Sequence, residues 1–310
     1  MRLLLLRCLL ACTGFILGSA RAAPEPVILA NAHLAVRVDP AHGLILGLCL
    51  PGQPNLLWVN PQPLASPRLG GWVNYGGEKL WWGPQLDWQA VTGRRFPPDE
   101  ALDGAWTVTA AAPDRLRMRS TVSPWVGIRA ERELTLDPGR PGVVIRNRFI
   151  RETAGRQRLQ LWTVCQLPLP QWCWLESRPA PGAGPFVNLR PALDPGQAVQ
   201  VDPAQGLVRG APSPTGPYLI GTRGGWIAAV YERQIIVHQV TPFPDGDYAE
   251  HVSLQLFFGP DYIELETLGG LATPAVGETM SNVVHWRVLP RPAQLTAAEL
   301  GRWLQAQLAE

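Results

Sequence analysis

The sequence predicts an all-β protein, most simply one large antiparallel sandwich followed by a short C-terminal helix. The 310 residues include 31 Gly and 32 Pro, and only 17% of them are charged. This composition is typical of turn-rich β proteins and disfavours coiled coils, helical bundles and acidic disordered chains. Short apolar or alternating segments recur between turn residues such as Pro244-Asp245-Gly246. No helical period of useful length separates them, which argues against a parallel α/β sheet.

The N-terminal residues 1–22 are typical of an export signal. Arg2 and Arg7 give a positive start, residues 9–18 form a short apolar run, and Ala20-Arg21-Ala22 resembles a cleavage site. The apolar run is too short for a transmembrane helix. We therefore divide the chain into a signal peptide (1–22), a β-sandwich domain (23–290) and a C-terminal helical segment (291–310).

A lipid anchor is the alternative fate of this leader. Leu9-Leu10-Ala11-Cys12 resembles a lipoprotein box, so Cys12 is a candidate for lipidation, although we favour ordinary cleavage. No other apolar span is long enough for a membrane helix, and the sequence predicts a periplasmic or extracellular protein. In an oxidising compartment Cys165 and Cys173 could pair across a hairpin, whereas Cys49 is expected in the core.

Charge and motifs exclude several functional classes. Without the leader the chain carries 24 basic and 25 acidic residues and no basic stripe, so we expect no nucleic-acid partner. No phosphate-binding glycine loop and no zinc spacing is present, and we expect no cofactor or metal. Asp245, Asp247 and Glu250 form a small acidic loop, for which a solvated turn is the preferred interpretation over a calcium site.

Each expected strand is a run of five to ten residues bounded by turn residues. These runs are 34–38, 44–50, 105–110, 115–122, 128–136, 143–150, 158–167, 225–231, 235–240, 252–258, 262–268 and 282–289. The Pro- and Gly-rich stretch 177–217 could link two domains, but we prefer a long rim loop of one sandwich. A helix follows, with Thr296 as N-cap, Glu299 at N3 and a stripe of leucines.

The densest unusual chemistry lies in residues 72–88, which hold four of the 13 tryptophans, the only lysine of the chain and a Gly-Gly pair. Adjacent glycines allow positive φ or a close backbone approach. Tryptophan faces and a few polar groups suit a sugar ring and its hydroxyls. A tryptophan-rich core is the alternative, and we prefer it for Trp82, Trp125 and Trp286. A core position suits Glu78, Lys79 and Gln85 less well, because buried charges need partners.

The segment Gly76-Gly-Glu-Lys-Leu-Trp-Trp-Gly-Pro-Gln85, followed by Phe96-Pro-Pro-Asp99, resembles an uncharacterised bacterial family of the galactose mutarotase-like superfamily. That family's motif reads roughly G-G-D-K-x-W-x-x-P-Q, with a W-P-P-D segment after it. Later segments resemble the same family in the expected order: 132–138 with 144–149, 161–166, 262–269 with 276–278, and Trp286. The resemblance implies a large antiparallel β-supersandwich whose concave face binds carbohydrate.

The resemblance also implies a chemistry. Mutarotases of this superfamily use a glutamate base at the anomeric hydroxyl and a histidine acid at the ring oxygen. Glu266 lies in a similar setting, and strand alternation places Tyr262, Glu264 and Glu266 on one face. Residues 161–166, which would supply the histidine, contain none. His238 or His251 could replace it, although a structural histidine is the commoner case, and Lys79 could donate instead.

These observations define a candidate site. We assign candidate catalytic roles to Glu266 and Lys79. The candidate substrate-binding residues are Glu78, Trp81, Gln85, Trp88, Asp99, Trp162, Gln166, Glu264 and His238.

The leading hypothesis is an exported carbohydrate-binding protein that acts as an aldose 1-epimerase. A binding module without catalysis is the first alternative, favoured by the missing histidine, and it would be stabilised by sugar without turnover. A polysaccharide lyase or hydrolase is the second, and it would need a Tyr or His base beside an Arg or Asn. Fold analogy alone does not decide among them.

Overall fold

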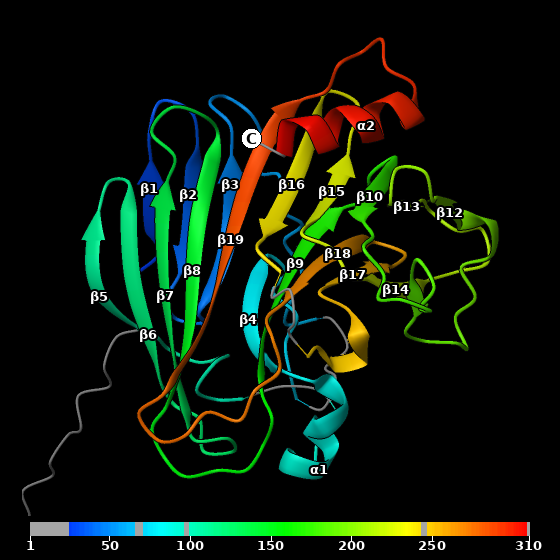
Figure 1. Cartoon of the computed structure of the whole chain (residues 1–310). Coiled ribbons are helices and arrows are strands. Elements are labelled where there is room, and N and C mark those ends of the chain that lie inside the picture. The colour runs from blue at the N-terminus through cyan, green and yellow to red at the C-terminus, as the bar shows by residue number, and fades with distance from the viewer. Residues whose placement is uncertain (1–24, 66–70, 96–98, 243–246, 309–310) are drawn as a thin grey trace, which may run out of the picture.

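The computed structural model describes residues 25–65, 71–95, 99–242 and 247–308, and these form two large antiparallel sheets packed face to face (Figure 1). The expected leader, with Cys12, lies outside the described residues, as does Asp245. No described helix has the length and apolar character needed to span a bilayer.

The first sheet has nine strands. Their order across the sheet is β1 (Val27–Ala30), β2 (Ala35–Asp39), β3 (Leu44–Cys49), β4 (Glu78–Gly83), β9 (Gln160–Pro168), β18 (Tyr262–Leu268), β17 (Leu254–Phe258), β14 (Tyr218–Thr222) and β11 (Val187–Asn188). Strands β4, β9 and β18 are neighbours although they lie far apart in the sequence. In their register Lys79 pairs with Val164, and Val164 pairs with Glu266.

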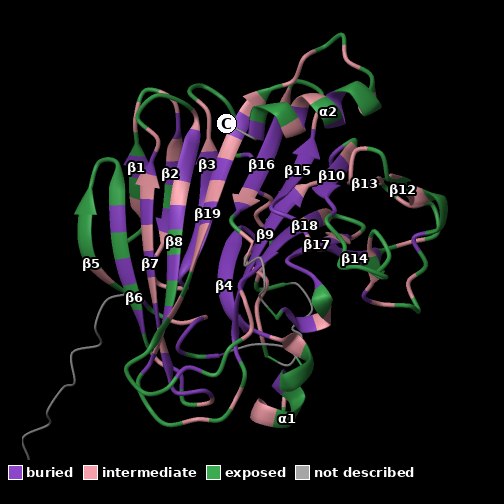
Figure 2. Ribbon diagram, viewed as in Figure 1, coloured by how far each residue is buried: buried purple, intermediate pink, exposed green. Residues whose placement is uncertain are grey.

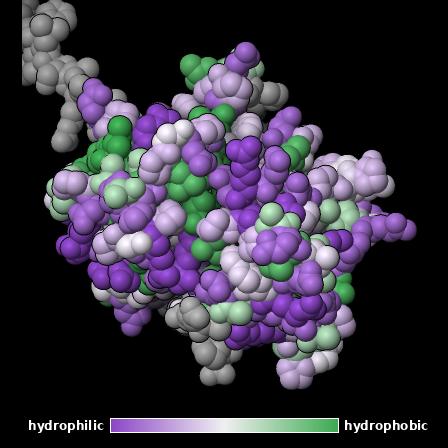
Figure 3. Space-filling model, turned by 90° about the horizontal axis from the view of Figure 1, so that it is seen from above, coloured by the Kyte–Doolittle hydropathy of each residue, from purple (hydrophilic) through white to green (hydrophobic). Residues whose placement is uncertain are grey.

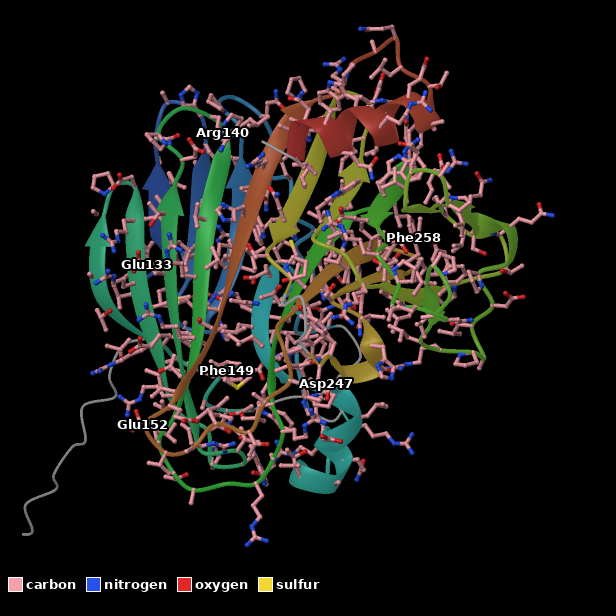
Figure 4. The ribbon with its side chains drawn as sticks, in the orientation of Figure 1. Glu133, Arg140, Phe149, Glu152, Asp247 and Phe258 are labelled. Atoms are coloured by element: carbon pink, nitrogen blue, oxygen red, sulfur yellow. The ribbon has the colours of Figure 1, made fainter. Side chains whose placement is uncertain are left out.

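The second sheet has ten strands. Their order is β12 (Val199–Asp202), β13 (Leu207–Gly210), β10 (Trp172–Glu176), β15 (Trp226–Val230), β16 (Gln234–Val240), β19 (Thr279–Pro290), β8 (Gly142–Arg151), β7 (Ile128–Leu136), β6 (Arg115–Val122) and β5 (Thr107–Ala112). The outer face of β6 and β7 is charged, and Glu133 accepts hydrogen bonds from Arg115 at 2.7 Å and Arg117 at 2.6 Å. Glu133 is labelled in Figure 4.

The main core fills the space between the sheets. Phe149 on β8 and Phe258 on β17, both labelled in Figure 4, belong to it. Strands such as β6 alternate between buried and exposed residues, because one of their faces meets the core and the other meets water (Figure 2). Strands β4, β9 and β15 are almost entirely buried in the same view, because both of their faces are covered.

Helix α2 (Ala297–Leu308) covers part of the outer face of the second sheet, where it crosses the upper ends of β16 and β15 in Figure 1 and also packs on Trp174 of β10. Leu300, Leu304 and Leu308 pack on apolar side chains of that sheet. The predicted capping box is present: Thr296 donates from its backbone N–H and its hydroxyl to Glu299, at 2.8 and 2.7 Å. Seen from above, the surface is mostly hydrophilic, with apolar side chains gathered in smaller areas (Figure 3).

The predicted fold class is confirmed: the structure is all-β with two antiparallel sheets and a short C-terminal helix. The stretch 177–217, for which a rim loop was preferred, contributes short strands to both sheets, β11 to the first and β12 and β13 to the second. The remaining helices are single turns: η1 (Gln85–Asp87), α1 (Trp88–Thr92), η2 (Gly196–Ala198) and η3 (Ala249–His251).

Cys165 and Cys173, which could have paired across a hairpin, form no disulfide in the structure. Both thiols are free and buried. Cys165 lies on β9 of the first sheet and Cys173 on β10 of the second, because the chain crosses between the sheets where the sequence suggested a hairpin. Cys49, also free, ends β3 and is partly buried.

Candidate functional site

A cleft of about 780 Å³ lies on the outer face of the nine-stranded sheet. Its floor comes from β4, β9, β17 and β18, and its rim comes from η1, α1 and the loop around Arg190. The lining residues that the argument uses are Trp72, Trp81, Gln85, Arg95, Trp162, Arg190, Tyr262, Glu264 and Glu266.

The floor of the cleft carries two carboxyl groups, Glu264 and Glu266. They are two residues apart on β18, so their side chains lie on the same face, as alternation predicted. Each carboxyl is held by a neighbour on β9. Trp162 donates from Nε1 to Glu266 Oε2 at 2.5 Å, and Gln166 donates from Nε2 to Glu264 Oε1 at 2.7 Å.

The environments of the two carboxyl groups differ. Burial and the neighbouring Glu264 raise the pKa of Glu266 well above its usual range. Burial also raises the pKa of Glu264, but the charge of Lys79 opposes that rise. Two close carboxyl groups away from water do not both ionise readily, and of the two Glu266 more strongly favours the protonated form.

Tryptophans form one wall of the cleft. The Trp81 ring centroid lies 5.4 Å from that of Trp72 and 5.5 Å from that of Trp162, and these three rings line the cleft. Trp81 is fixed further by a hydrogen bond from Nε1 to Asp103 Oδ1 at 2.9 Å. Aromatic faces held this firmly suit the apolar face of a ring-shaped ligand.

Trp88 and Asp99, expected to contact substrate, support this wall from behind instead. Trp88 is buried against Trp81, Trp82 and Trp162 and donates from Nε1 to the Trp82 carbonyl at 3.0 Å. Asp99 accepts from Trp82 Nε1 at 3.1 Å, from the Ser123 hydroxyl and from a backbone N–H. Neither residue lines the cleft. The sequence correctly predicted that the tryptophans of residues 72–88 lie close together, but not which of them line the cleft.

Glu78, also expected in the cleft, faces the interior between the sheets. Alternation along β4 turns Lys79 and Trp81 away from the core and Glu78 into it. There Arg132 Nη2 donates to both of its carboxylate oxygens, at 2.6 and 2.7 Å, and both side chains are fully buried. Glu78 is therefore one half of a structural ion pair, and its partner was not anticipated.

The Gly-Gly pair behaves as predicted, because Gly76 and Gly77 both have positive φ (84° and 67°). A Cβ on Gly77 would lie 2.2 Å from the Ile45 carbonyl oxygen. The pair thus brings the chain against β3 before β4 begins.

His238, the proposed substitute for the missing acid, is not at the cleft. It lies on β16 of the other sheet and stacks on Trp286, with ring centroids 4.6 Å apart and planes 2° from parallel. Burial lowers its pKa to about 3, so it is neutral at physiological pH. None of the described residues that line the cleft is a histidine. His251 is exposed in η3 and does not line it either.

Lys79 lies behind the tryptophan wall. Its ammonium is 5.0 Å from the Trp72 ring centroid and 5.3 Å from that of Trp81, and it lines a separate small hollow together with Asp103. Burial lowers the pKa of Lys79 and raises that of Asp103 to about 6. Lys79 therefore acts on Glu264 through its charge, and it is not among the residues that line the large cleft.

Several residues at the cleft were missed by sequence reasoning, among them Arg190, Gln255 and Phe257. Arg190 comes from the Pro- and Gly-rich stretch and donates to Gln85 Oε1 at 3.3 Å, and Gln255 and Phe257 come from β17. No local sequence pattern placed Arg190 at the cleft, because its position depends on the path of the stretch 177–217 between the two sheets. Gln255 alternates with buried leucines on β17, and this pattern could have placed it on the outer face.

The acidic loop contributes no described ligand cluster. Asp247, labelled in Figure 4, forms an ion pair with Arg158. Glu250 reaches Gln255 Nε2 at 3.4 Å, close to the cleft. Within the described ranges, no group of three His, Cys, Asp or Glu residues is placed to hold a metal ion.

Comparison with known proteins identifies the fold. No family model matches the sequence, and no curated protein matches it either. Solved structures do match. A protein described as a candidate aldose 1-epimerase of Escherichia coli K12 has a TM-score of 0.57 at 17% identity, over 86% of this chain and 99% of the other.

A galactose mutarotase-like protein of Lactobacillus casei ATCC 334 has a TM-score of 0.57 at 9% identity, over 86% of this chain and all of the other. A candidate aldose 1-epimerase of Klebsiella pneumoniae has a TM-score of 0.58 at 10% identity, over 90% and 81% of the two chains. The protein therefore has the galactose mutarotase-like fold. At these identities the likeness shows the fold alone, and the resemblance to the uncharacterised bacterial family stays a prediction.

Proposed function

We propose that the cleft binds a saccharide and that the protein exchanges its anomers, as an aldose 1-epimerase does. The observation that carries this proposal is the pair Glu264 and Glu266 on the floor of a tryptophan-walled cleft, in environments that favour the proton on Glu266. Anomer exchange requires one proton removed and one delivered at two oxygens bonded to the same carbon. A carboxylate and a carboxylic acid side by side supply both functions.

The spacing of the pair suits this chemistry. Residues two apart on a strand have Cα atoms about 6.6 Å apart, which leaves room for a hemiacetal carbon between the two carboxyl groups. The cleft walls would stack on the sugar ring, and Gln85 and Arg190 on the rim can bond its hydroxyls.

The division of roles follows from the two environments. Lys79 stabilises the Glu264 carboxylate, so Glu264 takes the proton from the anomeric hydroxyl. Glu266 donates its proton to the ring oxygen as the bond between that oxygen and the anomeric carbon breaks. The product is the open-chain aldehyde with a free hydroxyl. Rotation of the aldehyde and the same steps in reverse close the ring as the other anomer and restore both carboxyl groups.

This division reverses the role that the resemblance gave to Glu266, and it removes the need for a histidine. It also gives Trp162 a function, because its N–H fixes the Glu266 carboxyl group in the cleft. The neighbours described as aldose 1-epimerases are consistent with the proposal at the level of fold.

The test is magnetisation-exchange NMR on the anomeric protons of a panel of aldoses and uronic acids, with the chain starting at Ala23. Accelerated exchange for one sugar supports the proposal and names the substrate. Line broadening without exchange would favour a binding module, and no effect on any monosaccharide would refute the epimerase.

We also propose that the protein is exported to the periplasm or beyond, on the strength of the leader sequence at residues 1–22. Cell fractionation with an antibody tests this, and mass spectrometry of the mature N-terminus separates cleavage near Ala22 from lipidation at Cys12. Recovery of the uncleaved chain from the cytoplasm would contradict export.

A further inference from the structure

A second hollow, of about 190 Å³, lies beside the cleft, and Trp72 lines both. Its polar lining comes from Lys79, Asp103, His42 and Tyr75. The proposed epimerase chemistry uses none of this space. A small polar hollow that shares a wall with a ligand cleft is suited to a substituent of that ligand or to a small molecule of its own.

Lys79 is the polar group of this hollow with bonding capacity to spare. Its side chain is almost completely buried, at 3% exposure. Its ammonium carries three N–H donors, yet among the described residues its one hydrogen bond is a long contact of 3.5 Å to Asn74 Oδ1. The faces of Trp72 and Trp81 attract the charge but accept no conventional hydrogen bond. A buried ammonium in this state gains from an anion.

Asp103 and His42, two other polar groups of the hollow, already have hydrogen-bond partners. Asp103 accepts from Trp81 Nε1 and from the backbone N–H of Asp99, each at 2.9 Å. His42 Nδ1 lies 2.9 Å from Asp39 Oδ2, and its ring is 4.4 Å from that of Tyr75. These contacts fix the walls and leave the lysine to meet a ligand.

We propose that this hollow is a carboxylate-binding subsite in which Lys79 Nζ bonds the anion. The anion belongs either to a small free carboxylate or to a uronic acid whose ring lies in the cleft, and the second case rests on the proposed function. A carboxylate fits better than a phosphate, because the carboxyl groups of Asp103 and Glu264 already act on the same ammonium and disfavour a dianion.

The chain offers a direct probe, because Lys79 is its only lysine. Protein labelled with ¹³C,¹⁵N-lysine therefore gives a single side-chain Cε signal in NMR. We expect sodium acetate to shift this signal saturably, whereas sodium chloride at equal ionic strength does not. D-glucuronate and D-galacturonate should shift it too, and D-glucose and D-galactose should not. A signal that neither acetate nor either uronate moves overturns the proposal without the need for any variant.

A pair of variants tests specificity. Lys79→Met removes the charge and keeps a linear side chain, whereas Arg95→Gln removes a cationic group that lines the large cleft. We expect Lys79→Met to weaken uronate binding about tenfold relative to binding of the matching neutral sugar by the same variant. Arg95→Gln should retain the preference for uronate. The proposal is overturned if Lys79→Met still prefers uronate over the neutral sugar. It is also overturned if only Arg95→Gln loses that preference, because the carboxylate would then bind in the large cleft.

The outcomes separate this proposal from the previous one. If acetate shifts the Lys79 signal but no sugar binds, the subsite stands as a site for free carboxylates and the sugar function fails. If neutral sugars exchange anomers and no carboxylate reaches Lys79, the epimerase stands and the subsite fails.

Discussion

Replacement of Arg132 by methionine tests the buried ion pair between the sheets. Arg132 donates to both oxygens of Glu78, and its Nε donates to Asn147 Oδ1 at 3.0 Å. Neither side chain of the pair reaches solvent. The Arg132→Met protein must therefore bury an unpaired carboxylate or protonate Glu78 in order to fold.

The cost of protonating Glu78 determines how much stability the Arg132→Met protein loses. The ordinary pKa of the glutamate is 4.5, so protonating it at pH 7 costs about 3.4 kcal/mol, and the lost bond to Asn147 adds about 1 kcal/mol. Burial already raises the pKa of Glu78 with Arg132 present, so we expect the free energy of unfolding to fall by at most about 4 kcal/mol at pH 7. A carboxyl group whose pKa is raised in the folded state destabilises only above its unfolded pKa. The loss should therefore shrink to about 2 kcal/mol at pH 5.

The assay is urea unfolding followed by tryptophan fluorescence at both pH values. Arg132→Met combined with Glu78→Gln is the matched control, because no charge then remains buried, and it should regain most of the stability. A loss at pH 7 below about 1 kcal/mol, or a loss equal at the two pH values, would refute the reasoning.

Glu266→Gln should slow anomer exchange at least about 100-fold without changing the melting temperature, and exchange at the wild-type rate would remove Glu266 from the mechanism. Trp162→Phe removes a bond that lowers the pKa of Glu266. Its activity should therefore persist to higher pH than that of the wild type, and an unshifted pH–rate profile would count against Glu266 as the acid. The thiols of Cys165 and Cys173 should react with Ellman's reagent in denaturant without prior reduction, whereas a disulfide would appear as missing thiols. Leu304→Ala should destabilise the protein by about 2–5 kcal/mol in urea unfolding, and a negligible loss would mean that α2 is not docked.

The sequence predicted the fold well where one face of a strand meets water. Residues 115–122, 128–136 and 262–268 were expected as strands with the bounds that the structure shows. Strand β4 was missed as a strand, because Glu78–Gly83 is covered on both faces and so lacks alternation. Strand β10 was missed for a similar reason, since it lies under α2 on one side and over the core on the other.

The site was predicted in part. Glu264, Glu266, Trp81 and Trp162 meet at the cleft because alternation on neighbouring strands is a local property. Glu78 could not be placed, because its partner Arg132 lies on the other sheet and no local pattern joins the two. His238, on the same sheet as Arg132, was misplaced for the same reason.

The order of strands in the nine-stranded sheet has a consequence for folding kinetics. The floor of the cleft needs β4, β9 and β18. Residues that pair between β4 and β9, or between β9 and β18, are about 80 to 100 positions apart in the sequence. Such pairings close large loops and form slowly, whereas hairpins such as β6–β7 close small ones. We expect the ability to bind a ligand to appear after most of the β structure during refolding. Ligand binding would then report completion of the native state more faithfully than circular dichroism does.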